Sequence, residues 1–136
     1  MVQKVVLGAI VVRDGRVLIL QRNKSETVLP GLWELPSGKK EPLEKSEDGL
    51  IREVREETGL EVKIKSLVSV FDYQIEKPEE IRDSTQINFL VEPVGSLEPA
   101  ISEEHESFAW IDRSDLGNYE LSDATKAVIL SAFKVI

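Results

Sequence analysis

The chain has 136 residues, 41% of them hydrophobic, which is enough for one domain with a buried core and too few for two. Its 25 acidic side chains outnumber the 17 basic ones and give a net charge of −8, which argues against nucleic acid as a partner. The absence of cysteine excludes disulfides and thiolate metal sites.

The apolar runs of the chain are short. None approaches the roughly eighteen residues of a membrane span, and the N-terminal run is typical of a first strand and not of a signal peptide. We therefore expect a single cytoplasmic domain over residues 1–136, without a membrane partner. Composition leaves a monomer and a homodimer equally open.

Strands and loops are predicted in the first third of the chain. Residues 3–12 and 16–22 are rich in β-branched side chains, and the Asp14-Gly15 pair between them is a hairpin signal. Residues 23–45 contain repeated proline and glycine, which predicts mostly loop, with the segment LWELP as a short strand candidate.

A helix is predicted over residues 46–58, with Ser46 as its N-cap and Gly59 at its end. β-Branched and aromatic runs then predict strands at residues 60–75, 84–94 and 106–111.

The last predicted element is a helix in residues 122–136, with Ser122 or Asp123 as its cap. Strands therefore dominate, with one helix in the middle of the chain and one at its end. We expect an α/β fold in which a mixed sheet packs against helices.

Three glutamates gather on the predicted central helix. Glu53, Glu56 and Glu57 fall within an arc of about 100°, and Arg52 lies four residues before Glu56, close enough to pair with it. Clustered carboxylate oxygens suit a hard cation such as Mg²⁺ or Mn²⁺. Solvated acidic helix faces are also common, so these residues alone leave both interpretations open.

The spacing around the helix is more specific. From Gly38 to Leu60 the chain fills every specified position of the pattern G-x5-E-x7-R-E-U-x-E-E-x-G-U, where U is aliphatic. In this Nudix box, residues 38–60, the chain resembles the Nudix hydrolases, which cleave nucleoside diphosphates linked to another group. The resemblance implies an α/β/α sandwich and a divalent cation, Mg²⁺ or Mn²⁺.

Residue roles follow from the resemblance, position by position. It implies that Glu53, Glu56 and Glu57 bind the metal together with the backbone carbonyl of Gly38. It also implies that Arg52 orients a catalytic glutamate, for which Glu53 is the candidate.

Other positions of the box have structural roles or depart from the commonest pattern. By resemblance, Glu44 braces the loop and Gly59 stops the helix. Many relatives have glycine where this chain has Ser37, and alanine where Gly49 interrupts the helix at a cost of about 1 kcal/mol. The change at Ser37 bears on substrate preference more than on activity.

A further carboxylate is expected from a distant loop. Family members often place a catalytic base or ligand before a strand that carries a tryptophan, and this chain offers Glu103, Glu104 and Glu106 ahead of Trp110. Glu104 is the favoured candidate, while a solvated loop remains the alternative for the others. His105 suits a loop, or a partner of a ligand, better than it suits a metal ligand.

Substrate contacts are the least determined part of the site. Arg22 matches a position where relatives hold phosphate, Lys39 and Lys40 border the box glycine, and aromatic side chains could stack on a base. An exposed strand-end arginine, solvated lysines and core aromatics are the alternatives. The aromatic candidates are Trp33, Phe71, Tyr73 and Phe89.

The compact length and the segment GLWELPSGK resemble the branch that acts on nucleoside triphosphates, canonical or oxidised. We expect a small-molecule nucleotide substrate and release of a monophosphate and pyrophosphate. An ADP-ribose or nucleotide-sugar pyrophosphatase is the alternative enzyme. A non-catalytic nucleotide sensor is the alternative from another class, and the complete carboxylate set argues against it.

Overall fold

Strand β1 (Val2–Arg13) lies at the centre of the fold. It pairs in parallel with β6 (Glu80–Pro93) and antiparallel with both β2 (Arg16–Arg22) and β4 (Ser37–Lys39). The predicted mixed sheet is therefore confirmed. This computed structural model describes residues 1–96 and 98–136.

Three more strands extend the sheet on either side. Strand β5 (Val62–Lys77) pairs antiparallel with β6 and forms one edge. Strands β3 (Trp33–Glu34) and β7 (His105–Ile111) both pair antiparallel with β2. A 3-10 turn, η1 (Arg113–Asn118), follows β7 and was not predicted; an Asp112 capping box closes its start.

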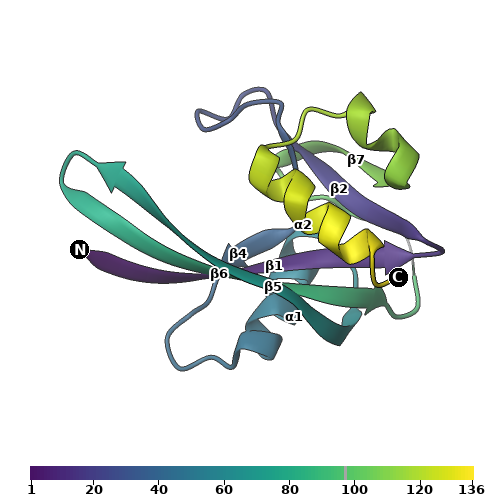
Figure 1. Cartoon of the computed structure of the whole chain (residues 1–136), viewed down its shortest axis with the longest axis horizontal. Coiled ribbons are helices and arrows are strands. Elements are labelled where there is room, and N and C mark those ends of the chain that lie inside the picture. Colours follow the sequence, from purple (N-terminus) through teal and green to yellow (C-terminus); the bar gives the residue numbers. More distant parts are fainter. Residues whose placement is uncertain (97) are drawn as a thin grey trace.

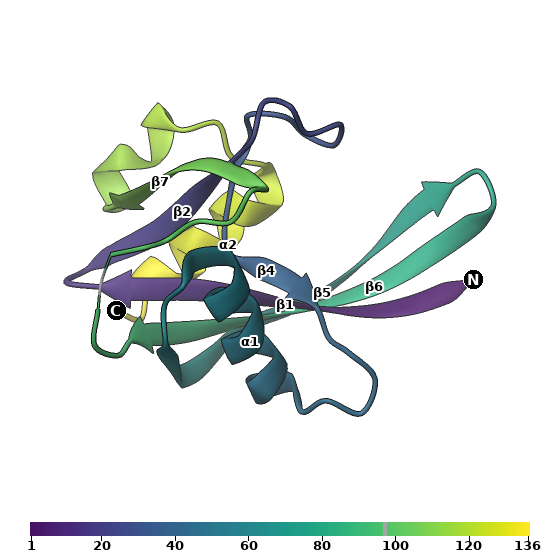
Figure 2. The same cartoon turned by 180° about the vertical axis from the view of Figure 1, so that it is seen from behind.

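Two helices cover opposite faces of the sheet. Figure 1 shows α2 (Asp123–Phe133) in front of the strands, and the reverse view in Figure 2 shows α1 (Ser46–Thr58) on the other side. Each helix packs on its own apolar cluster, to which α1 contributes the buried Leu50 and Val54, and α2 contributes Val128 and Ile129. The expected α/β/α sandwich is confirmed.

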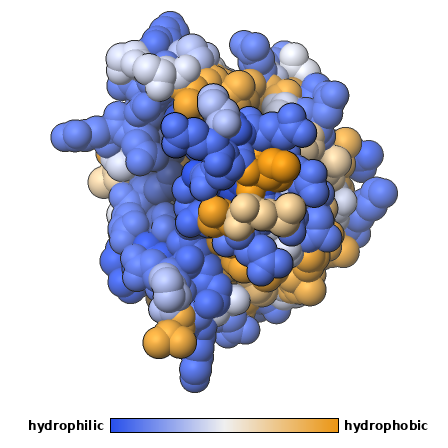
Figure 3. Space-filling model, turned by 90° about the vertical axis from the view of Figure 1, so that its left-hand side faces the viewer, coloured by the Kyte–Doolittle hydropathy of each residue, from blue (hydrophilic) through white to orange (hydrophobic). Residues whose placement is uncertain are grey.

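The β5–β6 hairpin and the start of β1 form an arm that extends beyond the helices (Figure 1). Viewed from that side, the surface is mostly hydrophilic (Figure 3), as expected from the net charge. The strand prediction 84–94 was wrong at its start, because β6 already begins at Glu80. Charged residues there have weak strand propensity, but Lys77 and Glu80 pair across the hairpin.

Helix and turn ends follow their backbone geometry. The N-cap of α1 is Lys45, with no side-chain cap bond to a described residue, so the prediction of Ser46 was wrong by one position. Gly59 ends α1 in the left-handed conformation, as predicted, and its N–H bonds to the carbonyl of Arg55. The Ser122 hydroxyl caps α2, and Ser122 is one of the two residues predicted for this cap.

None of the helices in the described residues is long and apolar enough to span a bilayer.

Candidate active site

A cavity of about 420 Å³ gathers the carboxylates predicted from the box helix. Strand β4, helix α1 and the loop before β7 form its walls. Its lining residues are Ser37, Gly38, Lys39, Glu53, Glu56, Glu57, Ser102 and Glu104. The structure thus brings together the four residues predicted to bind metal and the favoured glutamate of the distant loop; their roles remain predictions.

Gly38 allows the Glu53 carboxylate to lie directly against β4. A Cβ atom at position 38 would sit 2.0 Å from the Glu53 carboxylate, a separation that real Cβ atoms do not adopt. The Glu53 side chain is consequently only 14% exposed. Burial raises the pKa of Glu53, and the adjacent Arg52 guanidinium opposes that rise.

Arg52 bridges three carboxylates. Its Nε and Nη2 donate to the two oxygens of Glu44 at 2.8 and 3.0 Å, and its Nη1 donates to Glu53 at 2.9 Å and to Glu56 at 3.2 Å. The predicted pairing with Glu56 is present, but the two-point contact with Glu44 has the better geometry. Arg52 therefore fixes the position of Glu53 from a guanidinium that is itself held in place.

Glu44 braces the loop that leads into α1. Besides binding Arg52, its carboxylate accepts the backbone N–H of Glu41 at 3.0 Å, and these hydrogen bonds, that of Arg52 first, lower its pKa to about 2. A Cβ atom at Gly49 would lie 2.6 Å from Glu44 Oε1 and 2.8 Å from Leu7 Cδ1. Glycine at position 49, where many relatives have alanine, thus leaves room for the Glu44 carboxylate.

Glu57 is the most deeply buried carboxylate of the cavity, with 8% of the residue exposed. Its Oε1 accepts the backbone N–H of Ser37 at 2.7 Å. Burial raises the pKa of Glu57 to about 8; the Ser37 bond opposes the rise, and the charges of Glu34, Glu104 and Glu53 add to it. A carboxylate in such surroundings gains its charge most readily when a cation lies beside it.

The three candidate glutamates before Trp110 lie in different surroundings. Glu104 lines the carboxylate cavity. Glu106 instead accepts the backbone N–H of Lys24 at 2.7 Å, and Glu103 is exposed to solvent. Of the three, Glu104 is therefore the one that the structure brings to the carboxylate cavity.

His105 was expected in a loop, but it begins β7 and is 4% exposed. Its Nε2 lies 2.9 Å from Oε2 of Glu34, and the two form a hydrogen bond. One ligand atom each from Glu34, Glu57 and His105 lie within 4.8 Å of one another, so this group has the spacing of a metal-binding set. Glu34 was missed from sequence, although the alternation in LWELP gave a signal for it.

Two predicted substrate residues have structural partners. Arg22 donates from Nε to the carbonyl of Val28 at 2.9 Å and from Nη1 to Glu34 at 3.4 Å, so it is neither exposed nor free to reorient without breaking these bonds. Trp33 packs edge to face on Tyr119 with 4.9 Å between ring centroids. Lys39, the third candidate, borders the carboxylate cavity, where it is exposed.

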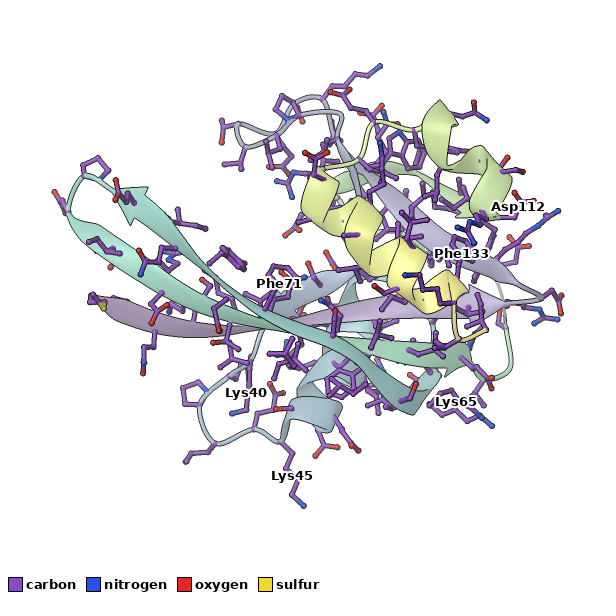
Figure 4. All side chains as sticks on the ribbon, in the orientation of Figure 1. Lys40, Lys45, Lys65, Phe71, Asp112 and Phe133 are labelled. Atoms are coloured by element: carbon purple, nitrogen blue, oxygen red, sulfur yellow. The ribbon has the colours of Figure 1, made fainter. Side chains whose placement is uncertain are left out.

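A second cavity, of about 480 Å³, lies between the sheet and α2. Its walls include Phe71 and Tyr73 of β5, whose rings are 5.8 Å apart, and Figure 4 shows Phe71 near α2. Phe89 lies instead in the core under α1. Ser37 lines both cavities, so they adjoin at β4. We call the first the carboxylate cavity and the second the aromatic cavity.

An α/β/α sandwich with clustered carboxylates on its box helix is the arrangement expected of a hydrolase that cleaves phosphoanhydrides. The sequence model of the NUDIX domain matches residues 2–133. The chain belongs to the Nudix hydrolase family, whose members hydrolyse pyrophosphate linkages in nucleotide derivatives and typically use divalent metal ions.

Proteins of similar sequence match this chain over almost its whole length. The chain is 30% identical to the nucleoside triphosphatase NudI of Escherichia fergusonii, over 93% of this chain and 94% of that protein. It is 28% identical to NudI of Klebsiella pneumoniae, with the same coverage. The crystal structure of a MutT NUDIX hydrolase from Burkholderia pseudomallei matches with a TM-score of 0.80 and 31% identity, over 96% of this chain and 98% of that one.

Proposed function

We propose that this enzyme hydrolyses a nucleoside triphosphate to the monophosphate and pyrophosphate. The observation that carries the proposal is the contact of the two cavities at Ser37: one offers aromatic walls for a base, and the other offers carboxylates for a metal–phosphate complex. The relatives named nucleoside triphosphatase support the same substrate class.

The donor set fits a hard divalent cation, and we propose Mg²⁺ or Mn²⁺. Glu53, Glu56 and Glu57 provide carboxylate oxygens, and the close approach of Glu53 to Gly38 places the β4 backbone beside them. When bound, such an ion neutralises phosphate charge and lowers the pKa of a coordinated water.

We assign the remaining roles, which are positioning, proton transfer and phosphate contact, to other residues of the chain. Arg52 holds Glu53 in position through its bonds to Glu44 and Glu53. Glu104 accepts the proton of the attacking water, whose oxygen bonds to phosphorus as the bridging P–O bond breaks and pyrophosphate leaves. Lys39 lines the carboxylate cavity and Arg22 bonds to Glu34. Both are proposed to contact phosphates, Arg22 after releasing Glu34.

We propose that the base packs against the rings of Phe71 and Tyr73, since both line the aromatic cavity. Trp33, the other aromatic candidate, then contributes by packing: its ring contacts Tyr119 and supports the strand that carries Glu34. This assignment moves the stacking role predicted for Trp33 to β5.

A substrate panel tests the proposal. Purified protein is incubated with nucleoside triphosphates, canonical and oxidised, and with ADP-ribose and nucleotide sugars, with Mg²⁺ or Mn²⁺, and products are separated by ion-exchange chromatography. Triphosphates should yield monophosphate and pyrophosphate in preference to all others. Faster cleavage of ADP-ribose or a nucleotide sugar would refute the substrate class, and binding without turnover would indicate a sensor.

A matched pair of variants tests the base. Glu104→Gln should lower kcat by about 10²-fold or more, as expected when a general base is lost. Glu103→Gln makes the same chemical change at the exposed neighbouring residue and should leave kcat unchanged. Equal effects of the two substitutions would contradict the assignment of Glu104.

A further inference from the structure

Two amide side chains form a fixed network beside the aromatic cavity. Asn88 of β6 is fully buried; its Nδ2 donates to Ser69 Oγ at 3.2 Å, and its Oδ1 accepts from Gln86 Nε2 at 2.9 Å. Space for this pair exists because position 8 is glycine. A Cβ atom at Gly8 would lie 2.2 Å from Asn88 Oδ1 and 3.3 Å from Gln86 Nε2.

In this network the Nε2 end of the Gln86 amide faces Asn88, and the Oε1 end remains for a ligand. One N–H of Nε2 is bound to Asn88, and the Oε1 atom lies on the opposite side of the amide carbon. Gln86 itself lines the aromatic cavity and pairs in register with Phe71 on β5. Its carbonyl oxygen is thus an acceptor placed next to the ring that is proposed to contact the base.

A second acceptor faces the same cavity. Glu34 also lines it, and as a carboxylate it can only accept; one of its oxygens already binds His105 and Arg22. The hydroxyls of Ser122 and Thr125 bond to each other at the start of α2. The hydroxyls of Ser37, Tyr73 and Thr125 can donate or accept, whereas the free oxygens of Gln86 and Glu34 can only accept.

We propose that Gln86 is a specificity-determining residue whose amide carbonyl accepts a hydrogen bond from an exocyclic amino group of the nucleobase. This proposal rests on the proposed function and names its substrate class: bases that carry an amino group in place of a carbonyl. Cytosine should be preferred to uracil, and adenine to hypoxanthine. An acceptor facing an acceptor loses at least about tenfold in affinity.

Substrate pairs that differ at this one position provide the test. We expect kcat/KM for CTP to exceed that for UTP, and for ATP to exceed that for ITP, by about tenfold or more. Gln86→Met removes the carbonyl with little change in shape and should bring both ratios close to one.

Gln74→Met is the matched control, since Gln74 is an exposed glutamine of β5 whose register partner is Asp83. It should leave both ratios unchanged, and thermal unfolding of each variant checks its fold. A wild-type preference for UTP and ITP, or ratios that persist in Gln86→Met, would overturn the assignment of Gln86.

Binding measurements separate this inference from the proposed function. Affinities of CMP, UMP, AMP and IMP, measured by calorimetry with Mg²⁺, report base selection without turnover. If no triphosphate is hydrolysed but the amino bases still bind more tightly and lose that advantage in Gln86→Met, the proposed function fails and the role of Gln86 stands. Equal affinities within both pairs would overturn that role whatever the activity.

Discussion

The substitution Glu57→Gln should stabilise the metal-free protein while it destroys metal-dependent activity. Glu57 is buried, and its pKa is raised to about 8 mainly by that burial. Glutamine keeps the shape and the oxygen that accepts the Ser37 N–H, but it carries no charge and no titrating proton. The same side chain is thus expected to oppose folding without a cation and to be needed once a cation binds.

The sign and size of the effect follow from the raised pKa. An acid whose pKa is higher in the folded chain contributes its full stability below the ordinary value of 4.5 and loses it as the pH rises through about 8. At pH 7 the folded chain must keep a proton that the unfolded chain releases, which costs about 3 kcal/mol at about 1.4 kcal/mol per pH unit. Relief of even part of this cost would be measurable.

Urea unfolding in EDTA at pH 5 and pH 8 provides the assay. The wild-type free energy of unfolding should fall between these two pH values, and Glu57→Gln should remove most of that fall. Glu56→Gln is the control, because it removes a carboxylate from the same helix where the side chain is 56% exposed. The same pH dependence in Glu57→Gln and wild type would refute the reasoning, as would loss of stability in Glu57→Gln at pH 8.

Three further substitutions test the geometry of the box. Gly38→Ala should push the Glu53 carboxylate aside and cost about 1–3 kcal/mol in urea unfolding, and metal affinity measured by calorimetry should fall with it. In an ordinary helix, Gly49→Ala would raise the free energy of unfolding by about 1 kcal/mol. Here the new Cβ atom would clash with Glu44, so the substitution should destabilise the protein, and a rise in Tm would contradict this. Arg52→Lys cannot keep the two-point bond to Glu44 and should lower kcat more than it raises KM for a triphosphate; an unchanged kcat would exclude a positioning role.

The carboxylate cluster could be predicted from sequence because most of it lies on one helix. Helical periodicity alone places Glu53, Glu56 and Glu57 on adjoining positions of a surface, and the fixed distance to Gly38 connects them to a strand. The distant carboxylate was ambiguous for the opposite reason. Glu104 ends the loop and Glu106 lies two residues on, in β7; only their contacts separate them, since Glu104 lines the carboxylate cavity and Glu106 binds the backbone of Lys24.

The aromatic cavity depended on long-range pairing that no local pattern determines. Phe71 and Gln86 are brought together by the register of β5 and β6, which also contains two irregularities. A slip of one residue would turn the opposite set of side chains toward α2. The sequence therefore named Phe71 and Tyr73 among several aromatics, but it could not separate them from Trp33 and Phe89.

Strand β4 connects the proposed metal site to the proposed base site through a single residue. The backbone N–H of Ser37 holds Glu57 in the carboxylate cavity, a bond that any residue but proline could make. The register of β4 with β1 pairs Ser37 with Gly8, the position that leaves room for the Gln86–Asn88 network. Serine in place of glycine at position 37 therefore adds a side chain at the aromatic cavity and keeps the backbone hydrogen bond to Glu57. We expect this difference to affect substrate choice and not metal binding.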